Sequence, residues 1–302
     1  MQCLYYRGVQ HEKTFKHYCQ SMIKFLLCIL FSCILSQGNY QILSCSSNFN
    51  DMLKVESQNQ NKNYALFNAS LPADINIFSG YINYNELFKK QLNYDLRLGY
   101  KSIDYGTLED SQTNNQFKAH ESAVEINLMK EEILEDTDLE ITFGYLKSKI
   151  ETYNSEAIYT NLKWILPLRS HDLLVFKLEN FGSVIEHYTS SKIRLPKTVG
   201  LSYALSNTLP FDIFIGYENR MDLNDKTLHV TAILNVIENV KLYISSDSNR
   251  KELFYGDYVQ ELFAGLRFGL DYSNELNSFG FGMQNLGPAG NATFLSFSRK
   301  IK

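Results

Sequence analysis

The sequence predicts an all-β protein, a closed antiparallel transmembrane β-barrel of about 14 strands. Three observations predict it: long runs of alternating apolar and polar residues, connections that alternate between short and long, and no segment with the pattern of a long amphipathic helix. In "LNYDLRLGYK", residues 92–101, every even position is apolar or aromatic and every odd position is polar, charged or glycine. Such a run exceeds the roughly 5 to 6 residues of a soluble strand and matches the roughly 9 to 11 that cross a bilayer.

The beginning of the chain resembles an export signal. In "MIKFLLCILFSCILSQG", residues 22–38, Lys24 precedes a mostly apolar run, and Ser36-Gln37-Gly38 forms a small-x-small cleavage site. We therefore expect residues 1–38 to be an upstream extension plus a signal peptide, with translation starting at Met1 or Met22. Residues 39–62 are polar and are expected to form a flexible lead-in, which leaves 63–302 for the barrel.

Charge and cysteine content exclude several classes of function. Without residues 1–38 the chain has 25 basic and 32 acidic residues, a net charge of −7, so no nucleic-acid partner is expected. Four of the five cysteines lie in the leader, and Cys45 has no internal partner. Neither a disulfide framework nor a cysteine metal site is therefore expected.

Alternation recurs along the rest of the chain and predicts the strands in order. The expected runs are 63–71, 74–84, 92–101, 124–128, 139–145, 158–166, 174–178, 199–205, 211–217, 228–236, 240–244, 266–272, 278–286 and 292–301. They are spaced by roughly nineteen residues, whereas short strands of a soluble sandwich are spaced by roughly 8 to 12. The wider spacing favours strands that cross a membrane.

The connections give an independent test of the barrel. Short ones are expected at 168–172, 206–210, 237–239 and 274–278, and long ones at 104–116, 181–193 and 247–262. In chain order these fall on alternate connections, so all the long loops would lie at one end. Outer-membrane barrels have short periplasmic turns and longer external loops. An even strand number then places both chain ends on the periplasmic side.

No pattern predicts catalysis, a cofactor or a metal site. His120 points away from Glu121 and Glu125 on a strand, and His229 faces the polar side of its strand without a serine at a specified spacing. The glycines of "GLRFG" and "GFG" precede no helix, so they do not predict a phosphate-binding loop. The acidic run 130–140 lacks the spacing of a calcium loop. We expect a protein that is not an enzyme.

The stretch "LENFGSVIEHYTSSKIRLPKTVGLSYAL", residues 178–205, resembles the PorV/PorQ family of outer-membrane proteins. The resemblance rests on an apolar strand that ends in Asn-x-Gly, a loop, Leu-Pro, and a Gly-x-Ser-Tyr strand. A second part follows at the end of the chain, in "GLDYSNELNSFGFGMQNLGPAGNATFLSFSRKI", residues 269–301. The motif residues, which we expect to be structural, are Asn180, Gly182, Leu195, Pro196, Gly200, Tyr203, Asn285, Gly287 and Asn291.

The resemblance implies a barrel like that of the long-chain fatty-acid transporter and a role in type IX secretion at the outer membrane. Its partners would be lipid, secretion-system components and secreted cargo proteins. Two features depart from the family: an Asn-Pro-Ala element is represented only by "NASL", residues 68–71, and the chain ends in Ile301-Lys302 rather than in an aromatic residue. The resemblance therefore does not extend to any plug function that depends on the Asn-Pro-Ala element.

Two other functions remain open from the sequence. One is a fatty-acid-transporter-like or porin-like channel, which differs from the secretion role in whether the lumen is open. The other is a soluble or surface-attached β-sandwich adhesin. If the chain acts by recognition, its long loops are the exposed surfaces, and Phe254, Tyr255 and Tyr258 are the expected partner-binding residues in the third loop. The same aromatics also suit an interfacial girdle.

Overall fold

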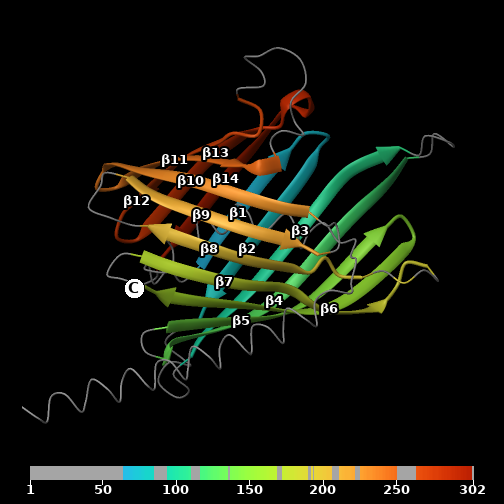
Figure 1. The fold of residues 1–302 in the computed structure, drawn as a ribbon. Helices are drawn as coiled ribbons and strands as arrows, with labels where there is room; N and C mark the ends of the chain where they lie inside the picture. Colours follow the sequence, from blue (N-terminus) through green and yellow to red (C-terminus); the bar gives the residue numbers. More distant parts are fainter. Residues whose placement is uncertain are drawn as a thin grey trace, which may run out of the picture. The chain divides into compact units, whose positions relative to one another are not determined.

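The computed structural model contains a closed barrel in which every strand is antiparallel to both neighbours (Figure 1). The structure describes residues 64–84, 94–109, 116–134, 137–168, 172–189, 192, 194–205, 211–221, 225–249 and 263–300. The expected export segment and lead-in, residues 1–62, lie outside this part of the chain. The prediction of a closed barrel of about 14 strands is confirmed.

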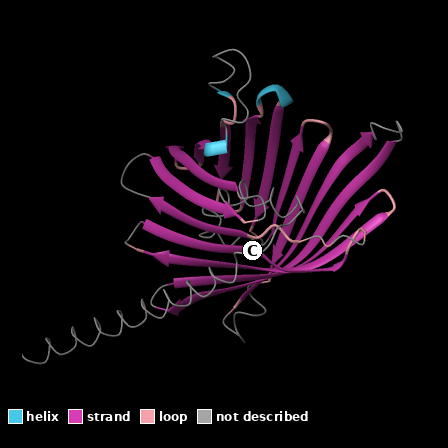
Figure 2. Ribbon diagram, turned by 45° about the vertical axis from the view of Figure 1, so that its right-hand side comes forward, coloured by secondary structure: helices cyan, strands magenta, loops and turns pink. Residues whose placement is uncertain are grey.

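Strand lengths divide the wall into two parts. One part has five long strands: β3 (Asp95–Glu109), β4 (Gln116–Leu134), β5 (Thr137–Ile150), β6 (Tyr153–Pro167) and β7 (Asp172–Glu186). The rest comprises β1 (Tyr64–Leu71), β2 (Ile75–Asn83), β8 (Thr198–Leu205), β9 (Phe211–Arg220), β10 (Asp225–Ile237), β11 (Val240–Asp247), β12 (Arg267–Ser273), β13 (Asn277–Asn285) and β14 (Asn291–Arg299). Figure 2 shows strands through almost all of the described wall, and no helix among the described residues is long and apolar enough to cross a membrane.

The first and last strands close the barrel. β1 pairs with β14 from Tyr64 opposite Arg299 to Ser70 opposite Thr293. On its other side β1 pairs with β2 through a three-residue turn. Elsewhere in the wall, each strand pairs with the strands that precede and follow it in the sequence. Closure leaves no free edge, so backbone N–H and C=O groups pair along both sides of each strand.

The two faces of the wall differ as the alternation predicts. The outer face carries exposed large apolar and aromatic side chains on strands all around the barrel, among them Leu66, Leu98, Val124, Phe143, Ile158, Leu201, Ile215, Leu228, Ile244, Leu270, Phe281 and Leu295. The residues between them face inward, and many are polar and buried, such as Asn127, Glu140 and Lys177. An apolar exterior that surrounds a polar interior is the arrangement of an outer-membrane barrel. The chain is placed in the outer membrane on this basis.

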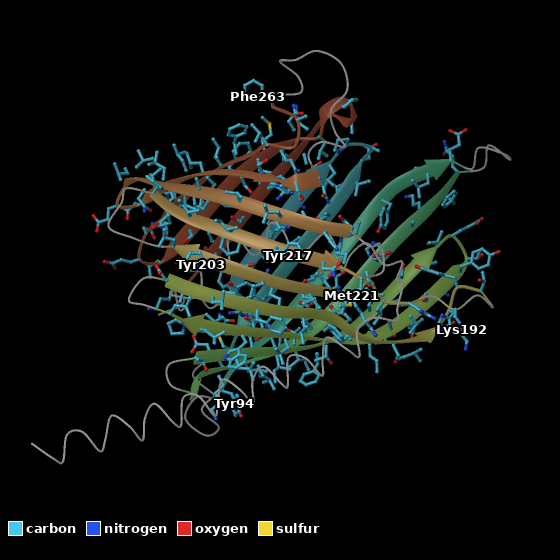
Figure 3. The ribbon with its side chains drawn as sticks, in the orientation of Figure 1. Tyr94, Lys192, Tyr203, Tyr217, Met221 and Phe263 are labelled. Carbon is cyan, nitrogen blue, oxygen red and sulfur yellow. The ribbon has the colours of Figure 1, made fainter. Side chains whose placement is uncertain are left out.

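The connections predicted to be short and those predicted to be long lie at opposite ends of the barrel, but connection length does not separate the ends completely. The eleven-residue connection 84–94 lies with the short turns, and the two-residue turn between β5 and β6 lies with the long loops. The turns after β6, β8, β10 and β12 all lie at the end where β1 begins and β14 ends; we call it the short-turn end. The connections after β3, β7 and β11 lie at the other end, the long-loop end. In Figure 3, Tyr94 lies at the short-turn end and Lys192 at the long-loop end.

Two of the expected long loops are shorter than predicted. β3 continues beyond Asp104 to Glu109, and β7 continues beyond Phe181 to Glu186. In β3 the pairing with β4 shifts between Asp104 and Thr107, where Gly106 has φ +68°. The alternation of the sequence breaks in both strands where the register shifts. These breaks mark bulges inside strands, because an extra residue in one strand interrupts a period of two without ending the pairing.

The assignment of lipid and lumen faces predicts opposite outcomes for two neighbouring substitutions in β14. Leu295 is exposed on the outer face, whereas Ser296 lines an interior cavity. Leu295→Arg should destabilise the inserted barrel by about 2–4 kcal/mol, since lipid cannot hydrate the guanidinium, and Ser296→Arg should be tolerated. The fraction of each variant that migrates as folded barrel on unboiled gels measures the difference. Equal losses would contradict the assignment.

Candidate functional site: the barrel lumen

The inner wall is lined by polar and charged side chains that pair across strands. On β3 and β4, the Lys101 ammonium lies 2.7 Å from Glu125 Oε1. The same carboxylate oxygen accepts a hydrogen bond of 2.8 Å from the hydroxyl of Tyr159 on β6. The Tyr159 ring lies over Gly144 of β5, because a Cβ built on Gly144 would be 2.2 Å from the ring. A glycine on β5 therefore lets a β6 side chain reach a partner on β4.

A second ion pair crosses the wall over another glycine. Lys177 on β7 and Glu218 on β9 are both register partners of Gly200 on β8, and the Lys177 Nζ lies 3.7 Å from Glu218 Oε1. Glu218 Oε2 is also 3.5 Å from Nε2 of His229 on β10. All three side chains are almost fully buried. A large residue at position 200 would separate the lysine from the glutamate.

Other inward polar and charged side chains also have partners on nearby strands. Asn127 donates hydrogen bonds to Glu140 and, at 3.1 Å, to Oγ1 of Thr142. The Arg267 guanidinium on β12 lies 2.8 Å from Oδ2 of Asp247, close to the end of β11. A charge in a narrow lumen loses much of its hydration, so a nearby partner or hydrogen bond lowers the cost of burying it.

An interior cavity of about 450 Å³ lies toward the short-turn end. Its lining comes mainly from β1 to β4 and β11 to β14, and the β10–β11 turn contributes Glu238 and Asn239. Three cationic and three anionic side chains line it, together with several serines: Arg97, Lys101, Lys241, Glu125, Glu238, Asp271, Ser79, Ser273, Ser278, Ser296 and Ser298. Arg97 lies 4.5 Å above the Tyr81 ring and donates to Oδ1 of Asn83 at 2.8 Å. Apolar and aromatic residues, among them Phe67 and Phe297, line the rest, so the cavity combines charges of both signs with apolar surface.

Toward the long-loop end, the inner wall formed by β3 to β6 carries an apolar cluster. Ile103, Leu146 and Tyr159 belong to a buried cluster, and Leu195, from the connection between β7 and β8, packs among them with 2% of its surface exposed. The described residues of this connection are 187–189, 192 and 194–197, and we call them the strap. Tyr188 donates to the hydroxyl of Ser148, which further fastens the strap to the inner wall. The strap therefore occupies part of the lumen on this side.

The first group of motif residues lies around the strap. Asn180 has φ +63° and forms a bulge in β7, where Glu179 and Asn180 together face Asn161 of β6. Its backbone N–H donates to Asn161 Oδ1 at 2.7 Å, and its side-chain amide donates to the Pro196 carbonyl at 2.9 Å. Asn180 thus joins the bulge to the strap beside Leu195. Gly182 is needed for close approach, since a Cβ there would be 1.9 Å from the Ile158 carbonyl oxygen.

The other motif residues lie apart from this group. Tyr203 on β8 donates to Oδ2 of Asp172 at 2.8 Å. Asn285 accepts a hydrogen bond from the N–H of Gly287 at 2.8 Å, and Gly287 has φ +62° in the turn before β14. Asn291 opens β14, directly opposite Asn285, with its side chain exposed. These contacts are consistent with structural roles, although none of them tests the resemblance.

The predicted partner-binding residues Phe254, Tyr255 and Tyr258 lie outside the described part of the chain, so their role stays a prediction. Sequence reasoning placed Lys101 on the polar face of its strand but named neither Tyr159 nor Tyr188 as a lumen residue. The inward parity of Lys101 and Tyr159 was available from the alternation, but their partners depend on register between strands. Within the described residues, no group of three or more His, Cys, Asp or Glu side chains is arranged to hold a metal ion.

Comparison with known proteins identifies a fold class. No protein-family model and no curated protein matches the chain. Among solved structures, the CymD monoaromatic hydrocarbon channel is similar with a TM-score of 0.52 and 8% identity, over 81% of this chain and 90% of that one. Omp33 of Acinetobacter baumannii matches with a TM-score of 0.44, 10% identity and coverage of 80% and 98%. A FadL homologue of Pseudomonas aeruginosa matches with a TM-score of 0.44 and 8% identity, over 78% of this chain and 87% of that one.

These similarities are similarities of fold. The chain belongs to the class of outer-membrane β-barrels that its closed wall, apolar exterior and polar lumen define. CymD has a TM-score above 0.5 and supports this class directly. The resemblance to PorV/PorQ stays a hypothesis of family membership within the class.

Two motif glycines make a matched test of the close approach at the bulge. A Cβ at Gly182 would overlap the Ile158 carbonyl, whereas a Cβ at Gly200 would lie at an ordinary 3.4 Å from Glu218. Gly182→Ala should therefore lower stability by about 1–3 kcal/mol or more, and Gly200→Ala should change it little. Urea unfolding in detergent micelles measures both. Equal stability of the two variants would show that β6 and β7 are not so close.

Proposed function

We propose that the chain is a porin-like channel for small polar solutes in the outer membrane. The observation that carries the proposal is a cavity of about 450 Å³ inside a closed barrel, lined by three cationic and three anionic side chains. Charges of both signs and the serines replace part of the hydration of a passing solute. The fold similarity to a channel supports conduction, and the six charged side chains of the lining favour polar solutes.

The strap gives this channel a constriction. Leu195 and Pro196 are almost fully buried, and the Asn180 amide fixes the Pro196 carbonyl. Solutes would have to pass beside the strap, so we expect low conductance rather than that of a wide pore. Wide porins have 16 to 18 strands, whereas a 14-stranded wall encloses a narrower lumen.

Conductance of the purified protein in a planar bilayer tests the proposal. Wild type should conduct, and Ser296→Trp should reduce the conductance by roughly half or more because the indole fills part of the cavity. Leu295→Trp, which adds the same side chain on the outer face, should leave it unchanged. An assembled wild-type barrel that carries no current would refute the channel.

A second candidate is assistance to type IX secretion, as the resemblance to PorV/PorQ implies. It is supported by the position of Asn180, Leu195 and Pro196, which together close part of the lumen at the long-loop end. A barrel that is closed there would act through recognition of secretion components or cargo, with Phe254, Tyr255 and Tyr258 as the predicted contact residues. No nucleic-acid partner and no catalytic step enters either candidate.

The two candidates predict different effects of changing the third loop. Replacement of Phe254, Tyr255 and Tyr258 by serine should abolish secretion of cargo in the secretion role, while the barrel still assembles. In the channel role it should leave secretion intact. Reduced barrel assembly would identify the three aromatics as membrane anchors, which would refute the partner-binding loop.

A further inference from the structure

The long strands β4 and β5 change character on their outer face near the long-loop end. On β5, exposed Phe143 and Tyr145 are followed by exposed Lys147 and Lys149. On β4, exposed Ile126 and Val124 are followed in the same direction by Ser122 and then exposed His120. Side chains that alternate along a strand lie on one face, so each strand passes from an apolar belt to a polar, largely cationic end.

The register aligns these two changes. His120 is the partner of Lys149, Ser122 of Lys147, and Val124 of Tyr145. The basic side chains of the two strands therefore lie side by side. The next outward-facing pair toward the short-turn end is Tyr145 and Val124. Lys118 continues the β4 row and is also exposed. We call Lys118, His120, Lys147 and Lys149 the basic ridge.

Directly below the basic ridge, the outer wall contains an apolar groove of about 470 Å³. It is lined by Val124, Ile126, Phe143, Tyr145, Ile158, Thr160, Phe181 and Ser183, together with the glycines of β5 and β7. The bulge at Asn180 and the close approach of Gly182 to β6 locally distort the wall where this groove lies. The groove opens on the lipid-facing side, because its large side chains belong to the exposed outer belt.

Acidic residues border the ridge on both sides. Asp104 of β3 is the register partner of His120, and on β6 Glu156 lies 3.4 Å from the Lys147 ammonium. Glu186 of β7 is the partner of Glu156. These carboxylates offset part of the positive charge and would repel an anion from the flanks. Glu151, in the turn between β5 and β6, is also exposed, and its backbone N–H donates to the Lys118 carbonyl. An anionic group would therefore be favoured over the ridge itself, where Lys118, Lys147 and Lys149 are exposed.

We propose that the basic ridge and the groove form a binding site for a phosphorylated lipid of the outer leaflet. The head-group phosphate would contact Lys147, Lys149 and His120, and an acyl chain would lie in the groove against Phe143 and Ile158. The long-loop end faces outward because short turns are periplasmic in outer-membrane barrels. Lysines just outside an apolar belt attract anionic lipid head groups, and lysine ammonium groups form charge-assisted hydrogen bonds with phosphate.

The occupant is a lipid rather than a free anion because the groove continues from the ridge. Free phosphate would use only the lysines and would gain nothing from an apolar groove that faces hydrocarbon. An acyl chain can fill the groove between Tyr145 and Phe181. A wall without the bulge in β7 would lack this depression. The site lies on the outer wall, so it is independent of whether the lumen conducts.

Binding of diphosphorylated lipid A to the purified full-length protein in detergent micelles tests the site. Lys147→Gln/Lys149→Gln should weaken binding by roughly tenfold or more, since each lysine near an anionic lipid surface contributes roughly fivefold. Lys226→Gln is the matched control: it removes an exposed lysine on β10, on another part of the wall, and should not change binding. Lys149→Gln alone keeps the Lys147–Glu156 ion pair and serves if the double variant fails to assemble.

A groove variant separates lipid from free anion. Ser183→Phe fills the groove from β7 with an apolar side chain on the lipid face, so it should weaken lipid A binding while the lysines remain in place. Inorganic phosphate should not displace the lipid at millimolar concentration. Unchanged binding in the lysine variants would overturn the proposal. Displacement by phosphate would also overturn it, by identifying a simple anion contact, and so would an ineffective Ser183→Phe, because the groove would then hold no acyl chain.

Discussion

The structure depends on one constraint: a strand in hydrocarbon has no water to satisfy its backbone, so every N–H and C=O must pair with another strand. The pairing of β1 with β14 meets this requirement by removing the last two free edges. It also explains the two faces, because a closed wall has one side in lipid and one side around a lumen. The apolar belt and the buried charges are thus consequences of the same closure.

The closed lumen creates a second requirement, since its charges cannot be fully hydrated. Glycines at inward positions meet it by letting side chains two strands apart interact: Gly200 lies beneath Lys177 and Glu218, and Gly144 lies beneath Tyr159. Toward the long-loop end, the wall from β3 to β6 also carries apolar side chains inward, and Leu195 of the strap packs against them. One lumen therefore contains both a charged cavity and an apolar cluster that the strap covers, which is why both conduction and recognition are proposed.

The sequence predicted the parts of the fold that depend on periodicity. Strand number and the lipid-facing set follow from a period of two, and both agree with the structure. The separation of short from long connections agrees only in part, because the connection 84–94 lies with the short turns. Strand ends were less accurate, because the bulge at Asn180 reads as the end of an alternating run although β7 continues to Glu186. The contacts of Asn180 with the strap could not be predicted, since they join residues whose separation is fixed only by register between strands. The outer groove beside Gly182 could not be predicted for the same reason, because register brings its lining residues together.

A disulfide cross-link between β1 and β14 tests closure most directly. Ala65 and Ser298 are register partners, so cysteines at these positions, with Cys45 replaced by serine, should form a disulfide in the folded barrel. A pair at Ala65 and Ala292 lies six residues out of register and should not. Efficient cross-linking of the first pair alone is the result that closure predicts. An assembled protein in which the first pair stays reduced, or in which both pairs cross-link equally, would contradict a closed barrel in this register.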